Sequence, residues 1–194
     1  AELSAGDLGL GAKFGADFKL SDDSNLYSTY SLDIERDVSG LRVMKGSFVN
    51  GFRSQTSESM SIYGEERYTH GDVPTGLTHA YGVNLTTDTQ WHYGAAFETG
   101  SLRDPQTSAV TDRTALSLSA GYTHDTLRYT GAIEYRTDSG STSSRSTYLL
   151  KNRVAYQSNP SWRLFGKFNY SNSTSTLGEF YDGQFIETVF GYAF

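Results

Sequence analysis

The chain has 194 residues, enough for one sizeable domain, with a net charge of −6 and no cysteine. The mean hydropathy is −0.49, and no apolar run approaches about 18 residues, which excludes a helical membrane protein. The mild negative charge argues against nucleic-acid binding, and the lack of cysteine removes disulfide scaffolds and thiolate metal sites. No signal peptide precedes Ala1, so we expect a mature or engineered start.

Alternation of apolar and polar side chains begins near the N-terminus. Over residues 8–20, Leu10, Phe14 and Phe18 share one face, whereas Lys13 and Asp17 share the other. About 9–11 tilted residues suffice for a strand to cross a bilayer, so this segment predicts a full crossing. Similar alternation predicts strands over 26–35, 42–53, 59–68, 77–86 and 90–99.

The second half repeats the pattern more regularly, with strands expected over 116–122, 127–136, 148–157, 162–170 and 184–194. In the last of these, the residues Ile186, Thr188, Phe190, Tyr192 and Phe194 lie on one face. No helical period competes over a comparable window. The sequence therefore predicts an all-β fold, a transmembrane antiparallel up-and-down β-barrel that forms a single domain over 1–194.

The connections between these strands alternate in length. Short polar turns are expected near 21–25, 54–58, 86–89, 123–126 and 157–161, and longer loops near 36–40, 70–76, 100–113, 137–146 and 171–183. Outer-membrane barrels have short periplasmic turns and longer extracellular loops. Trp91 and Trp162 each follow a short turn, where interfacial aromatic residues belong.

The strand count conflicts with this architecture. Eleven strands are predicted, whereas bacterial single-chain barrels have an even number, and residues 1–7 are too short for another crossing. Either a strand is split or missed, or the chain comes from a longer barrel, or the barrel closes with a parallel pair. We expect about twelve strands, within a range of 10–12.

The closing strand, QFIETVFGYAF, resembles the last strand of Gram-negative outer-membrane β-barrels. In that family the terminal aromatic strand is also the signal read by the assembly machinery, a role that the resemblance gives to Phe190, Tyr192 and Phe194. The resemblance implies a location in the bacterial outer membrane. It also implies that the lipid bilayer and the assembly machinery are partners.

Two further segments resemble the C-terminal barrel regions of large proteobacterial surface proteins. They are GEERYTHGDVPTGLTHAYGV at 64–83 and GEFYDG at 178–183, and the resemblance covers about residues 25–194. In those proteins, repeats precede a barrel that anchors them in the membrane. The resemblance therefore implies a membrane anchor as an alternative to a passive pore.

The face opposite the aromatic one is charged, and we expect it to line the lumen. Such charges either line a water-filled channel or pair across it, and a wall rich in Arg and Lys would favour anionic solutes. The competing interpretation is a solvated or salt-bridged interior without selectivity. The predicted lumen-lining residues are Lys13, Asp17, Asp33, Glu35, Arg128, Glu134, Arg136, Lys151, Arg153, Arg163, Lys167 and Glu187.

Two alternative functions stay open at this point. His70, Asp72 and His79, with Glu65 and Glu66 nearby, could form the rim site of an outer-membrane hydrolase or a weak metal site, although no nucleophile is marked. A soluble β-barrel that holds an apolar ligand is the other alternative, and it would turn the aromatic face inward. We expect no enzyme activity, catalytic residue, metal or cofactor.

Overall fold

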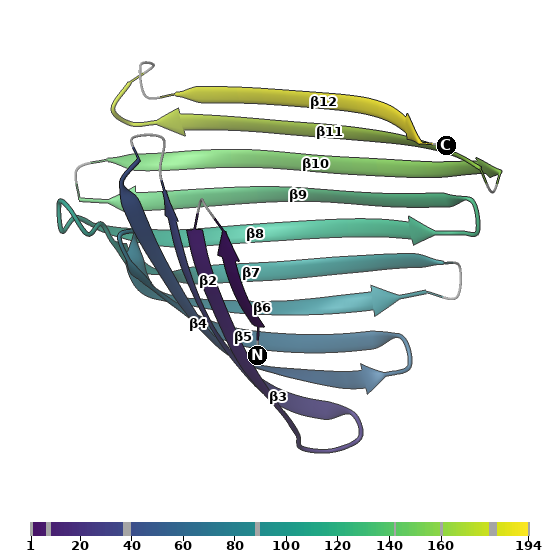
Figure 1. Cartoon of the computed structure of the whole chain (residues 1–194), viewed down its shortest axis with the longest axis horizontal. Helices are drawn as coiled ribbons and strands as arrows, with labels where there is room; N and C mark the ends of the chain where they lie inside the picture. Colours follow the sequence, from purple (N-terminus) through teal and green to yellow (C-terminus); the bar gives the residue numbers. More distant parts are fainter. Residues whose placement is uncertain are drawn as a thin grey trace.

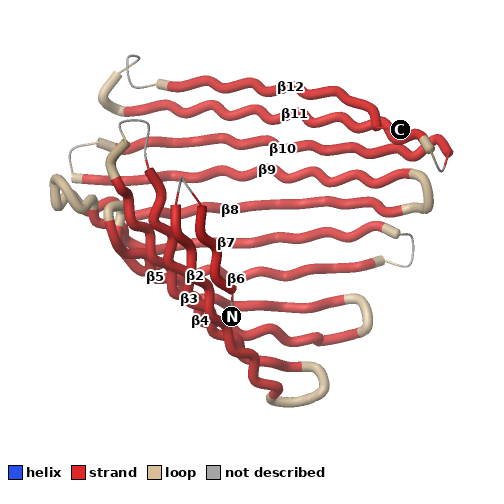
Figure 2. Tube along the Cα trace, viewed as in Figure 1, coloured by secondary structure: helices blue, strands red, loops and turns tan. Residues whose placement is uncertain are grey.

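The computed structural model describes residues 2–6, 9–36, 40–87, 90–141, 143–159, 161–178 and 182–193. Every regular element in these ranges is a strand (Figure 2). None of the described residues belongs to a helix long and apolar enough to cross a membrane.

The strands form one antiparallel sheet in which each strand pairs with its neighbours in the sequence (Figure 1). Figure 1 shows β1–β4 running at a steep angle to β6–β12, which lie side by side, because the antiparallel sheet curls strongly. The strands are β1 (Glu2–Gly6), β2 (Gly9–Lys19), β3 (Ser24–Arg36), β4 (Arg42–Ser57), β5 (Met60–Gly71), β6 (Thr75–Thr86), β7 (Trp91–Arg103), β8 (Val110–Thr123), β9 (Leu127–Gly140), β10 (Ser144–Asn159), β11 (Trp162–Ser175) and β12 (Gly183–Ala193). The eleven predicted strands correspond to β2–β12.

The strand that the sequence missed is β1. Its five residues pair antiparallel with β2, from Glu2 opposite Lys13 to Gly6 opposite Gly9. With β1 included, the sheet has twelve strands that alternate in direction, so the predicted count of eleven is corrected. Because β1 and β12 run in opposite directions, the alternative of closure by a parallel pair is also corrected. Among the described residues no pairing joins β1 to β12, and these two strands form the edges of the curved sheet.

The strands extend further than predicted, and the longer loops are correspondingly shorter. The expected loop over 100–113 is only 104–109, because β7 and β8 remain paired out to Arg103 opposite Val110. The expected loop over 137–146 likewise shrinks to 141–143. The prediction followed apolar alternation, which ends at the edge of the apolar band, whereas backbone pairing continues through polar residues.

The sheet has almost no hydrophobic core of its own. Among the described residues, only Ala80 and Ala115 are buried apolar side chains. Large apolar side chains are exposed along the whole sheet, including Phe18 at 65% and Phe190 at 82%. So much exposed apolar surface does not suit a water-soluble monomer, and it requires a lipid environment to cover it.

Cross-strand packing also depends on a close approach at Gly51 on β4. The ring of Tyr27 on β3 lies directly over this glycine, and a Cβ atom at position 51 would collide with the Tyr27 ring. The missing side chain lets Tyr27 reach across β4 to β5.

Candidate functional site

The strand register sorts the side chains onto two faces. Glu65 lies opposite Ala80, Ala80 opposite Glu98, and Glu98 opposite Ala115, so these positions share one face. The same reasoning, carried from β2 to β12, places all twelve predicted lumen-lining residues on this charged face. Trp91, Trp162, Phe190 and Tyr192 lie on the opposite, aromatic face.

The charged face of β3–β7 carries a connected network, which we call the paired wall: Tyr27, Glu65, Arg67 and Glu98. The Arg67 guanidinium donates through Nε to Glu65 Oε2 at 2.7 Å, and through a terminal nitrogen to Glu98 Oε2 at 3.2 Å. Tyr27 donates its hydroxyl hydrogen to Glu65 Oε1. The Glu65 side chain is only 15% exposed, so its charge depends on Arg67.

A second paired group lies further along the charged face, on β8 and β9. Arg113 pairs with Asp138 at 2.7 Å, and Arg136 pairs with Asp138 at 3.4 Å and with Glu134 at 3.8 Å. Ser117 also donates to Glu134 at 3.4 Å. The carboxylates here are thus matched by arginines on the same and the neighbouring strand.

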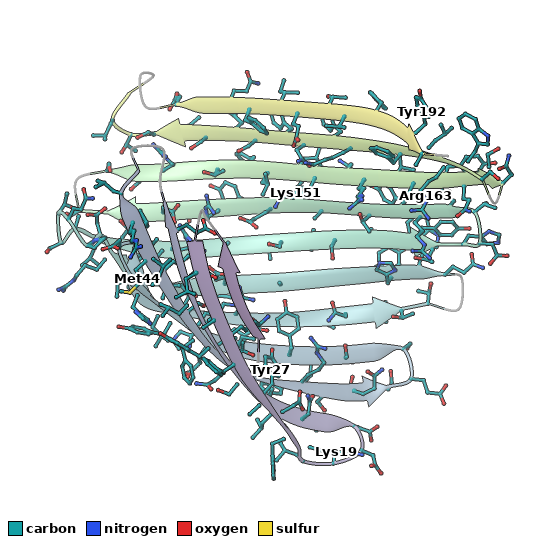
Figure 3. The ribbon with its side chains drawn as sticks, in the orientation of Figure 1. Lys19, Tyr27, Met44, Lys151, Arg163 and Tyr192 are labelled. Carbon is teal, nitrogen blue, oxygen red and sulfur yellow. The ribbon has the colours of Figure 1, made fainter. Side chains whose placement is uncertain are left out.

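A different arrangement occurs near the connections 124–126 and 160–161. Arg128 on β9, Arg153 on β10 and Arg163 on β11, which we call the arginine cluster, line one cavity of about 380 Å³. Arg153 also lines a second cavity, of about 720 Å³, together with Lys151 and Lys167. Figure 3 labels Lys151 on β10 and Arg163 on β11, which lie on the same face of neighbouring strands. Among the described residues, no carboxylate forms an ion pair with any arginine of the cluster.

The other predicted lumen-lining residues have local partners or neighbours. Lys167 pairs with Glu187 at 2.8 Å, and Asp17 accepts a hydrogen bond from Asn25 at 2.9 Å. Asp33 lies opposite Lys45 in the register. The two remaining residues, Lys13 and Glu35, lie opposite Ser31 and Val43.

The aromatic face carries ring clusters at the ends of the strands near the short turns. The Trp91 ring lies 5.0 Å from Tyr122 and 5.9 Å from Tyr93, measured between ring centroids. Trp162 on β11 stacks with Tyr192 on β12 at 6.0 Å. Phe194, the last residue of the predicted closing strand, lies outside the described residues.

The structure does not bring the two histidines of the hydrolase hypothesis together. Both lie on the aromatic face: His79 Nδ1 is 3.5 Å from Glu66, and His70 Nε2 is 3.3 Å from the Tyr30 hydroxyl. Within the described ranges, neither histidine hydrogen-bonds a serine or threonine hydroxyl. The same ranges hold no group of three potential His, Asp or Glu metal ligands.

The sequence missed several residues of the paired groups. Arg113 and Asp138 fall in segments predicted as loops, and neither Glu98 nor Tyr27 is among the residues predicted to line the lumen. Their pairing depends on which positions of distant strands face each other, and the alternation within one strand does not fix that register. The signal that could have found Arg113 and Asp138 is the alternation of polar residues beyond the apolar band.

Comparisons with solved structures identify the fold. A loop-deletion variant of OmpT, an outer membrane protein of Vibrio cholerae, aligns with a TM-score of 0.55 and 11% identity, covering 96% of this chain and 76% of that one. OmpT of the same organism, expressed in its outer membrane, aligns with a TM-score of 0.53 and 11% identity, covering 87% and 68%. The fold is that of an outer-membrane β-barrel.

This assignment confirms the predicted fold class and agrees with the predicted location in the bacterial outer membrane. A KdgM porin also aligns, with 11% identity, a TM-score of 0.49, and coverage of 95% of this chain and 92% of that one. No protein-family model matches the chain, and no curated protein sequence matches it. At these identities the similarity concerns the fold, so function must be argued from the residues.

Proposed function

We propose that the protein forms a water-filled pore in the outer membrane that favours small anionic solutes. The observation that supports this proposal is the arginine cluster, three guanidinium groups that line a cavity on the charged face and form no ion pair with any described carboxylate. A cationic side chain left unpaired in an aqueous lumen attracts anions. In the second paired group two arginines match two carboxylates, and in the paired wall one arginine faces two glutamates, so neither group leaves positive charge available to an anion.

The cluster is part of a longer basic strip. Lys151 lies on β10, on the same face as Arg153, and both residues line the 720 Å³ cavity. In this region Glu187 forms an ion pair with Lys167. Anions that pass along β9–β11 would therefore meet a continuous positive surface, whereas cations would be repelled from it.

A pore requires the two edges of the sheet to be joined in the membrane, because unpaired backbone groups cost several kcal/mol each in lipid. β1 and β12 run in opposite directions, so they can close the barrel with an antiparallel pair. The chain contains no cysteine, so cysteine pairs introduced along β1 and β12 report closure directly. Oxidation should then give a disulfide-linked form with altered gel mobility, and a complete failure to cross-link in membranes would contradict closure by these strands.

The pore itself is tested by single-channel recording of the refolded protein in a planar lipid bilayer. Steady ohmic steps are expected, with larger currents carried by chloride than by potassium. Inserted, heat-modifiable protein that gives no conductance would contradict the pore.

Membrane anchoring of a larger surface protein is the second candidate. The observations that favour it are the two paired groups, which bridge β3 to β7 and β8 to β9 and fill part of the charged face, and the resemblance of 64–83 to barrel regions of such proteins. A non-conducting barrel would support this role. In either role we propose contacts with the lipid bilayer and recognition of the closing strand by the assembly machinery.

We also propose that the protein has no catalytic activity. The support is geometric, because the two histidines of the hydrolase hypothesis contact Glu66 and Tyr30 separately. His79→Ala should leave any ester or peptide turnover at the background rate of the wild-type protein. A loss of measurable turnover in this variant would restore the hydrolase hypothesis.

A further inference from the structure

We infer that Arg128, Arg153 and Arg163 form a binding site for a polyvalent oxyanion of the phosphate type. This inference deepens the proposed function and rests on it, since it needs the charged face to line an aqueous lumen. It goes further by assigning one defined site to three residues, where a basic wall alone would give only a diffuse preference for anions.

The register brings the three arginines around one small residue. Arg128 lies directly opposite Ala155, Arg153 precedes Ala155 by two positions on β10, and Arg163 lies opposite Gln157. Directly opposed and diagonal cross-strand neighbours lie within about 8 Å of each other, which is within reach of arginine side chains. Ala155 lines the same cavity and has the smallest side chain of its lining residues.

The charge balance of the cavity indicates a polyvalent ligand. The three arginines contribute +3, and Asp125, which also lines the cavity, contributes −1, so the formal charge is +2. A monovalent ion leaves half of this charge unmatched, whereas a dianion matches it. The cavity of about 380 Å³ is open enough for such an ion to keep part of its hydration.

The side-chain chemistry of the cluster favours phosphate geometry. Guanidinium groups present planar pairs of N–H donors that bind phosphate or carboxylate oxygens in a bidentate manner. Thr130 and Gln157 line the same cavity and add neutral donors. A tetrahedral oxyanion has several acceptor oxygens, so it can engage donors on all three strands at once.

Three other arginines on the charged face provide the contrast. Arg67 lies 3.2 Å or less from two glutamates, Arg113 lies 2.7 Å from Asp138, and Arg136 lies 3.4 Å from Asp138. Their carboxylate partners already occupy the position that a bound anion would take. Asp125 lines the cavity of the arginine cluster, but among the described residues it forms no ion pair with any of the three arginines, so their donors stay available to a solute.

The site is tested with inorganic pyrophosphate as the probe and the refolded protein in detergent. Phosphorus NMR line broadening measures binding, and sodium chloride serves as the competitor. Wild-type protein should bind pyrophosphate in preference to chloride, and Arg128→Gln, Arg153→Gln and Arg163→Gln should each weaken binding by about tenfold, since each removes a charge-assisted hydrogen bond. Heat-modifiable mobility on gels confirms that each variant is folded.

Arg113→Gln is the matched control, because Arg113 lies on the same face but is paired with Asp138. It should bind pyrophosphate as wild type does. The site is overturned if folded wild-type protein shows no pyrophosphate binding, or if Arg113→Gln loses as much affinity as the cluster variants. Binding does not depend on conductance: a protein that binds but does not conduct overturns only the pore, and one that conducts but does not bind overturns only the site.

Discussion

The two walls of the charged face use the same residue types in opposite ways. On β3–β7, Tyr27, Glu65, Arg67 and Glu98 form a closed network in which each charge has a partner. On β9–β11, no arginine of the cluster forms an ion pair with a carboxylate among the described residues, although Asp125 lines the same cavity. Charged side chains of the same sheet thus form ion pairs between strands in one region and remain without an ion pair in another.

The number of charges in a barrel lumen therefore says little about its ion selectivity. A paired arginine stabilises the wall and adds almost no field, whereas an unpaired arginine adds field and leaves donors free. Substitutions in the first wall should therefore change stability, and substitutions in the second should change ion preference.

The largest effect is expected from breaking the paired wall at its centre. Arg67→Ala leaves the carboxylates of Glu65 and Glu98 on a half-buried face without their cation. We expect the free energy of unfolding to fall by about 2–3 kcal/mol, below the loss for a fully buried pair because Arg67 is 39% exposed. Urea unfolding in detergent, followed by tryptophan fluorescence, measures the change.

Tyr27→Phe is a milder substitution in the same network, since it removes only the hydroxyl that donates to Glu65. It should lower the free energy of unfolding by about 1 kcal/mol, the value of a typical hydrogen bond. Equal stability of Arg67→Ala and wild type would show that the network does not brace these strands.

The second prediction concerns the close approach that lets Tyr27 enter the network. Gly51→Ala places a methyl group against the Tyr27 ring and should destabilise the protein by about 1–2 kcal/mol. Gly15→Ala is its control, because a Cβ at position 15 meets nothing closer than 3.5 Å. The same unfolding assay distinguishes them, and equal effects at the two glycines would contradict the packing argument.

The third prediction concerns ion preference at the basic strip along β9–β11. Glu187→Gln removes the partner of Lys167 and should raise the permeability ratio of chloride over potassium, whereas Arg153→Gln should lower it. We expect changes of about twofold, as for single charges in an aqueous lumen. Reversal potentials measure both ratios, and shifts of the same sign in the two variants would contradict the account.

The smallest effect is expected in a loop outside the sheet. The Asp104 carboxylate accepts hydrogen bonds from the backbone N–H groups of Thr107 and Gln106, which lowers the pKa of Asp104. The pKa of Asp104 is lower in the folded state than in the unfolded state. These hydrogen bonds therefore stabilise the folded loop at pH values above the unfolded-state pKa, and the stabilisation is lost as the pH falls through the folded-state pKa.

Hydrogen exchange at the Gln106 and Thr107 amides should therefore show less protection at acidic pH, corrected for intrinsic rates. Asp104→Asn should largely remove this pH dependence, since an amide does not titrate. Protection that is constant with pH in the wild-type protein would contradict the assignment.

The fold could be predicted from the sequence because each strand carries its own evidence. Alternation fixes the two faces locally, so β2–β12 and the shared face of residues such as Lys13 and Arg163 followed from single segments. β1 was missed because five residues contain too little alternation to distinguish a strand from a frayed end.

The functional differences between the walls could not be predicted in this way. Whether an arginine is paired depends on the register between strands, which places Arg67 beside Glu98 on β7, 31 positions away. Alternation within a single strand therefore does not distinguish Arg67 from Arg153, since it can only place each of them on a face. Only the three-dimensional pairing separates a bracing residue from an available one.

The decisive measurement is the reversal potential of the refolded protein under a potassium chloride gradient. The account predicts a potential displaced toward the chloride equilibrium value. Replacing Arg128, Arg153 and Arg163 together by glutamine should abolish that displacement. A wild-type potential at the potassium equilibrium value, or an anion preference that survives the triple substitution, would contradict the account.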